Sequence, residues 1–152
     1  MISALGIASL AVLLFCVGAL ILHFRVMQKK SRVEGHFADL DNLLRDRLEL
    51  VMDLCADSTP GEVELAALCE SYVDGDVRDI IKALPKLRKA IDSFEEIFAS
   101  DEYIHNTGAL EDAAQDYNAA LDTYNGFIAN YPGKLMAQAL GLAPEKPLKL
   151  NL

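Results

Sequence analysis

The sequence predicts an all-α protein, with an N-terminal transmembrane helix followed by an antiparallel four-helix-type bundle of three long helices and one short helix. Residues 2–22 are apolar and contain no charge. Beyond residue 36, apolar residues recur at spacings of three and four, which places them on one face of a helix. No alternating apolar run of the kind that forms strands stands between turn signals.

The apolar run is long enough to cross a membrane, because a helix rises about 1.5 Å per residue and the hydrocarbon core is about 30 Å thick. A cleaved signal peptide is the alternative, and it would have basic residues before the run and a small-x-small site after it. Here no Lys or Arg precedes the run, and it ends in His23-Phe24-Arg25. We therefore predict an uncleaved anchor at residues 1–24.

Residues 25–35 form a basic collar next to the anchor. Positive charges flank a membrane span on its cytoplasmic side, so the N-terminus is expected outside and the rest of the chain in the cytoplasm. The same side chains can contact anionic lipid headgroups. The collar residues are Arg25, Lys29, Lys30 and Arg32.

Beyond the collar the chain is acidic. Residues 33–152 contain 23 Asp and Glu but only 10 Lys and Arg, a formal charge of −13. This charge argues against nucleic acid as a partner, since its phosphates would be repelled. Of three cysteines, Cys16 lies in the span, whereas Cys55 and Cys69 are predicted to be buried free thiols of a reducing compartment.

The bundle is predicted at residues 36–133, and its first helix runs from His36 to about Ala56. Only Gly35 weakly interrupts the stretch after the collar, so one interpretation is that the anchor helix continues into this helix as a stalk. A disordered segment at 25–35 is the alternative. The predicted buried stripe is Phe37, Leu40, Leu44, Leu48, Val51 and Cys55.

A break at residues 56–58 precedes a short second helix that ends near Tyr72. Thr59 and Glu62 fit a capping box, and Pro60 suits the first turn. The residues predicted to face inward are Val63, Ala66, Ala67, Leu68 and Cys69.

The third helix is predicted from Val77 to about Ala99, with Asp76 as its cap. Pro85 removes one backbone donor, so it either kinks this helix or begins it. The predicted stripe is Val77, Ile81, Leu84, Leu87, Ile91, Phe94 and Phe98.

A connection at 100–108 leads to the last long helix, Gly108 to Tyr131, which Pro132-Gly133 ends. Residues 134–152 are predicted to be a tail that docks or frays, because Pro144 and Pro147 prevent regular structure. The last helix carries a seam of Leu110, Ala114, Tyr117, Leu121, Tyr124, Ile128 and Tyr131.

Two motifs stand out along these helices. The first is the basic-then-Leu pattern Leu44-Arg45-Asp46-Arg47-Leu48, and the second is the doubled Tyr-Asn heptad, Tyr117-Asn118 and Tyr124-Asn125, that runs into Tyr131-Pro132. Together they resemble the LemA family of bacterial membrane-anchored helical proteins. The resemblance implies a four-helix cytoplasmic bundle on one anchor in the bacterial cytoplasmic membrane. It implies no settled biochemical activity.

The doubled heptad, Tyr117-Asn118 and Tyr124-Asn125, has two interpretations. In the first, which we favour, the tyrosines are core residues and the asparagines are interhelical or surface polar groups. In the second, all four residues form a contact seam for a partner. Lys82 and Lys86 belong to a basic stripe that either pairs with acidic side chains or forms a docking face.

Catalytic patterns are missing. Glu102-x-x-His105 is half of a di-metal motif, which needs a second Glu-x-x-His and two more inward carboxylates. We therefore expect no metal, cofactor or catalytic residue.

The sequence favours a non-enzymatic module at the cytoplasmic face of the membrane. It would contact lipid through its N-terminal helix, and protein partners or further copies of itself through the bundle. A membrane-associated enzyme or metal-dependent hydrolase, and an oligomeric subunit that remodels membranes or organises the envelope, are the alternatives.

Overall fold

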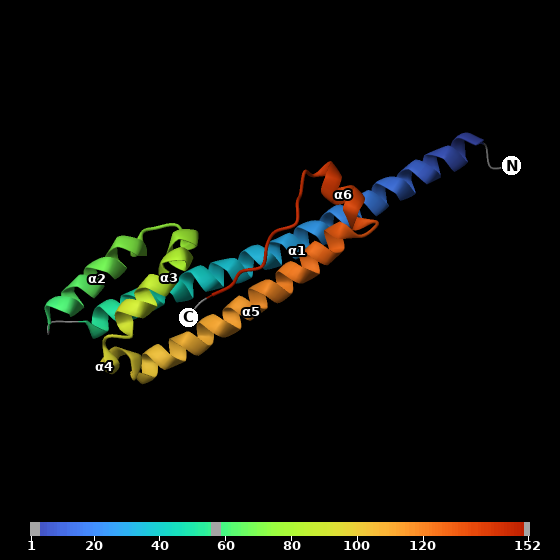
Figure 1. Ribbon diagram of the computed structural model, residues 1–152. Helices are drawn as coiled ribbons and strands as arrows, with labels where there is room; N and C mark the ends of the chain where they lie inside the picture. Colours follow the sequence, from blue (N-terminus) through green and yellow to red (C-terminus); the bar gives the residue numbers. More distant parts are fainter. Residues whose placement is uncertain (1–3, 56–58, 151–152) are drawn as a thin grey trace. The chain divides into compact units, whose positions relative to one another are not determined.

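The computed structural model describes residues 4–55 and 59–150, except the side chains of residues 4 and 5, and within those ranges every regular element is a helix (Figure 1). The predicted all-α class is confirmed. By compactness the chain divides into two units, which are described separately: unit 1 comprises residues 1–34 and 119–147, and unit 2 comprises residues 35–118 and 148–152. The helices are α1 (Ala4–Leu54), α2 (Pro60–Val73), α3 (Val77–Ile91), α4 (Glu95–Phe98), α5 (Asp101–Ala129) and α6 (Gly133–Ala139).

Helix α1 continues from the apolar run through the collar into the first bundle helix, as one of the two interpretations expected. Gly35 does not interrupt it, because a single glycine costs only about 1 kcal/mol in a helix interior. Residues 6–54 are the one described stretch long and apolar enough to cross a membrane, and the apolar window lies fully exposed. Length and composition alone make this weak evidence for a span. The predicted break at residues 56–58 lies outside the described residues.

Three predicted helix boundaries are wrong. Helix α5 begins at Asp101 rather than Gly108, and acidic side chains in its first turn favour that start. It ends at Ala129, so Tyr131 lies beyond the helix and is 81 % exposed instead of continuing the buried seam. Helix α3 ends at Ile91, and the separate short α4 leaves Phe98 exposed. Pro85 neither begins nor ends α3 but lies inside it.

Unit 2 holds a core that combines α2, α3 and α4 with the later part of α1 and the earlier part of α5. Helices α2 and α3 lie side by side and are joined by a short turn. The capping box of Thr59 and Glu62 is present as predicted. Val63 was expected to face inward but is 62 % exposed, because Leu65 and Cys69 form the buried face of α2.

Unit 1 holds a smaller buried set around the end of α5 and α6. Gly133 is required there, since a Cβ at this position would overlap the carbonyl oxygen of Phe127 and lie 2.9 Å from its ring. Gly141, with φ of +66°, ends the turn after α6, and residues 142–147 follow without helix. The buried residues of this unit are Val26, Val33, Leu121, Tyr124, Ile128, Gly133 and Ala137.

Candidate peptide-docking face

The two tyrosines of the doubled heptad are core residues. Tyr117 is 5 % exposed in unit 2, where its ring lies 5.6 Å from that of Phe37 between centroids. Tyr124 is 2 % exposed in unit 1, and burial is the main cause that raises the pKa of its phenol. The tyrosines therefore anchor α5 by burial and leave the neighbouring asparagines to make polar contacts.

Asn118 binds the backbone of Leu148 in unit 2. Its Nδ2 donates to the Leu148 carbonyl oxygen at 2.8 Å, and the Leu148 N–H donates back to Asn118 Oδ1 at 2.8 Å. One side-chain amide thus satisfies both backbone polar groups of one residue, as a neighbouring strand does in a sheet. We call this two-bond pairing an asparagine clamp.

Asn125 makes the same pairing with Glu145 in unit 1. Its Nδ2 donates to the Glu145 carbonyl oxygen at 2.8 Å, and the Glu145 N–H donates to Asn125 Oδ1 at 3.1 Å. Both clamps contact main-chain atoms only. Any residue with a free backbone N–H can therefore occupy a clamp, and proline cannot.

The clamped segment, residues 143–150, contributes little apolar surface. Leu148 and Leu150 are half-buried against the core of unit 2. The other residues of the segment, both prolines included, are exposed. The backbone hydrogen bonds and two leucine contacts therefore hold the segment, which docks rather than frays.

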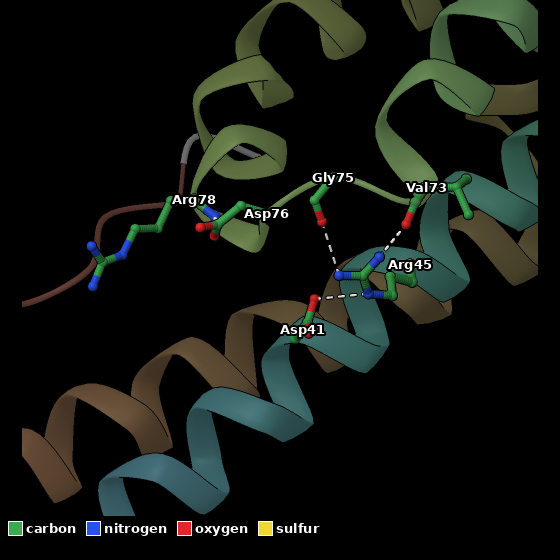
Figure 2. A network of polar contacts seen from close by, with 6 residues as sticks. All are labelled: Asp41, Arg45, Val73, Gly75, Asp76 and Arg78. Atoms are coloured by element: carbon green, nitrogen blue, oxygen red, sulfur yellow. Dashed lines mark hydrogen bonds and ion pairs between the residues drawn. The ribbon is translucent and has the colours of Figure 1, made fainter.

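Arg45, from the basic-then-Leu motif, binds the turn between α2 and α3 (Figure 2). Its Nε donates to Asp41 Oδ1 at 3.0 Å, its Nη2 donates to the Gly75 carbonyl oxygen at 3.0 Å, and its Nη1 donates to the carbonyl oxygen of Val73. A cation at a helix C-terminus is favourable, because carbonyl groups there lack helical partners. Arg45 therefore links α1 to this turn within unit 2.

The basic side chains that the sequence pointed to have separate environments in the structure. Lys82 pairs with Asp79 on its own helix at 2.8 Å, and Lys86 is exposed. In the collar, Lys29 Nζ lies 5.4 Å from the Phe127 ring centroid and Lys30 forms an ion pair with Glu34 at 3.5 Å. The remaining collar residues, Arg25 and Arg32, are exposed.

The residues that the sequence offered for metal binding or thiol chemistry form no metal site in the described ranges. Glu102 and His105 are exposed on the first turns of α5. Within residues 4–55 and 59–150, no group of three or more His, Cys, Asp or Glu is placed to hold a metal. Cys55 and Cys69 are buried free thiols, as predicted, and burial, followed by the nearby Cys55, raises the pKa of Cys69 to about 12.

Sequence reasoning missed the partners of the asparagines. The sequence offered one signal: two asparagines lie one heptad apart, and each of the two prolines near the end of the chain is followed directly by a residue that has a backbone N–H, Glu145 and Leu148. Comparison of the chain with protein-family models, with curated proteins and with solved structures gives no match.

Proposed function

We propose that this chain is a membrane-anchored, non-enzymatic, LemA-like interaction module at the cytoplasmic face of a bacterial membrane, and that it binds extended peptide segments through the Asn118 clamp of unit 2. The observation that carries the proposal is the pairing of Asn118 with both backbone groups of Leu148. The exposed apolar part of α1 supports the anchor, since it leaves an uncharged helix surface for lipid.

Recognition of this kind has two parts. The clamps bind backbone groups, as in β-strand addition, which gives affinity without regard to side chain. Leu148 and Leu150 add specificity, because both pack against the core while the residue between them is exposed. The expected ligand is an extended peptide with a backbone N–H and an apolar side chain at the Asn118 clamp, and another apolar side chain two residues later.

The chain's own segment 143–150 is a peptide of this kind, and it occupies the site as part of the same chain. A tethered segment has an effective concentration in the millimolar range, so a peptide from another protein must compete with it. Because the segment buries little apolar surface, its release exposes only two leucine contacts. The same face thus serves as a binding site that is occupied until a better peptide displaces the segment.

The test uses the full chain in lipid nanodiscs and a fluorescent peptide with the sequence of residues 141–152. In the chain, Leu148→Pro removes one clamped N–H and should release the segment, so the peptide should bind this variant more tightly than the wild-type chain. Adding Asn118→Ala removes two hydrogen bonds, each worth about 1 kcal/mol, and should weaken peptide binding about tenfold or more.

Two controls make the result specific to the backbone. Asn130→Ala removes an asparagine whose amide, among the described residues, donates to the Gly126 carbonyl oxygen of its own helix at 2.8 Å, and should leave peptide binding unchanged. A peptide N-methylated at the residue equivalent to Leu148 keeps every side chain but lacks the N–H donor. It should bind the Leu148→Pro chain more weakly than the unmethylated peptide does. Equal binding of the methylated and unmethylated peptides would refute the proposal.

A further inference from the structure

Arg47 is a buried cation whose contacts are all neutral. The residue is 5 % exposed, on α1 in unit 2. Its Nη1 donates to Thr107 Oγ1 at 3.2 Å, its Nη2 donates to Tyr103 Oη, and its Cζ lies 4.3 Å from the centroid of the Tyr103 ring. Within the described ranges no carboxylate lies within ion-pair distance of it. Buried charges are ordinarily paired, because an unpaired one forfeits its hydration.

The hydrogen-bond donors left over from the described contacts at this position outnumber the acceptors. A guanidinium has five N–H groups, and the described contacts use two of them. Thr107 donates its hydroxyl hydrogen to the Tyr103 carbonyl oxygen at 2.8 Å, so its oxygen is the acceptor for Arg47. Tyr103 Oη likewise accepts from Arg47, which leaves the phenol hydrogen for another acceptor. These side chains together favour an anionic ligand.

A cavity of about 470 Å³ adjoins these groups, within the size range of small-molecule sites. Arg47, Tyr103 and Thr107 form its polar part. Phe98 and Ile104 form an apolar part, and they are 47 % and 57 % exposed although both are large and hydrophobic. The cavity therefore offers a cationic end and an uncovered apolar surface.

Two exposed charges at the rim define the charge of the ligand. Arg88, in the last turn of α3, and Glu111, on α5, line the same cavity. With Arg47 they give the site a net charge of about +1, which a monoanion neutralises, whereas a dianion such as phosphate would leave the site with a net charge of about −1.

We propose that this cavity binds a monocarboxylate with a compact apolar body. The carboxylate accepts hydrogen bonds from Arg47 and Tyr103, in the planar arrangement that a guanidinium favours, and the body covers Phe98 and Ile104. The site shares no residue with the asparagine clamps, so it does not depend on the proposed peptide binding.

The probe pair is 4-phenylbutyrate and 4-phenylbutanamide, which differ in the charge of the head group and share the apolar body. Isothermal titration of the full chain in lipid nanodiscs, with empty nanodiscs as blank, should show the carboxylate binding at least tenfold more tightly than the amide. Equal affinities, or no binding of either compound, would overturn the proposal.

Surface variants test the site without disturbing the buried cation. Glu111→Gln should strengthen carboxylate binding two- to fivefold, and Arg88→Gln should weaken it by a similar factor. Lys89→Gln removes a neighbouring exposed charge that does not line the cavity, and should have no effect. If Glu111→Gln and Arg88→Gln shift the affinity in the same direction, or neither shifts it, the site is not the one inferred.

Tyr103→Phe tests the phenol as a donor. It keeps the ring over Arg47 and removes the hydroxyl, and we expect about tenfold weaker carboxylate binding and a smaller loss for the amide, whose acceptor is uncharged. Circular dichroism of the variant separates this loss from unfolding. An unchanged carboxylate affinity in the folded variant would remove Tyr103 from the site.

Discussion

Replacement of Arg45 by alanine should destabilise unit 2 substantially. The substitution removes hydrogen bonds from a charged donor to Asp41 and to the carbonyl oxygens of Val73 and Gly75. The Asp41 pair is about one-third exposed, at 32 % and 31 %, so it contributes at most about 0.5 kcal/mol. The two carbonyl bonds contribute about 1–2 kcal/mol each, because the guanidinium is charged and partly buried.

The expected loss is therefore about 2–4 kcal/mol, which lowers the Tm by about 10–30 °C in a unit of roughly 90 residues. Thermal unfolding followed by circular dichroism measures it, and amide exchange at the α2–α3 turn locates it. Arg45→Lys should lie between wild type and alanine, since one ammonium cannot bind all three oxygens in the same geometry.

Arg78→Ala is the matched control. It removes the same charge from an exposed residue, whose side chain makes no hydrogen bond or ion pair within residues 4–55 and 59–150 (Figure 2). Only the Arg78 backbone N–H is used, and it donates to the Asp76 cap at 2.9 Å. If Arg45→Ala differs from Arg78→Ala by less than about 0.5 kcal/mol, the link through the turn does not stabilise the fold.

Two further predictions concern stability. Gly133→Ala should lower the free energy of unfolding in urea by about 1–3 kcal/mol, because the new Cβ would overlap Phe127. Gly126→Ala, with open space around it, should raise the free energy of unfolding by about 1 kcal/mol. Similar values for both variants would refute the packing argument. Burial and the nearby Cys55 raise the pKa of Cys69 to about 12, so above the ordinary thiol pKa of about 8.5 the unfolded chain releases a proton that the folded chain keeps. For this thiol, stability should then fall by about 1.4 kcal/mol per pH unit between about pH 9 and 12. Cys69→Ala should reduce the slope in urea titrations at about pH 8 and pH 10, and should leave the part due to Cys55, whose pKa is also raised by burial.

The burial of the tyrosines was predictable because it depends on local geometry. The spacing of Tyr117 and Tyr124 places them on one helix face with Leu121, and all three are buried. The partners of the asparagines were not predictable in the same way. Asn118 pairs with a residue 30 positions away and Asn125 with one 20 away, and helical periodicity carries no information about either contact.

Helix ends were predicted less well, because several residues permit a break without requiring one. Thr107 and Gly108 looked like a connection, yet α5 runs through them and Thr107 bonds back to the Tyr103 carbonyl within the helix. At the other end, the seam spacing extends to Tyr131, but the helix stops at Ala129. Periodicity describes which side chains share a face only while the backbone stays helical.

The sequence also did not predict how far the two arginines of the basic-then-Leu motif are buried. A charged residue beside Leu44 and Leu48 is ordinarily exposed, and Arg45 is partly so. Arg47 is instead buried, because the hydroxyls of α5 accept its hydrogen bonds and the Tyr103 ring covers it. The burial of a cation is decided by such tertiary partners, which no spacing along α1 reveals.

The positions of the two prolines in the clamped segment determine whether the segment can bind the clamps. Pro144 and Pro147 exclude helix and favour an extended backbone, which lowers the conformational entropy that docking must remove. Neither stands at a clamp position, so neither deletes a donor that Asn125 or Asn118 needs. Exchanging the order of Pro147 and Leu148 would keep composition, charge and hydropathy constant and yet remove the clamped N–H. The order of residues in this segment, more than its composition, therefore determines whether it can occupy the face.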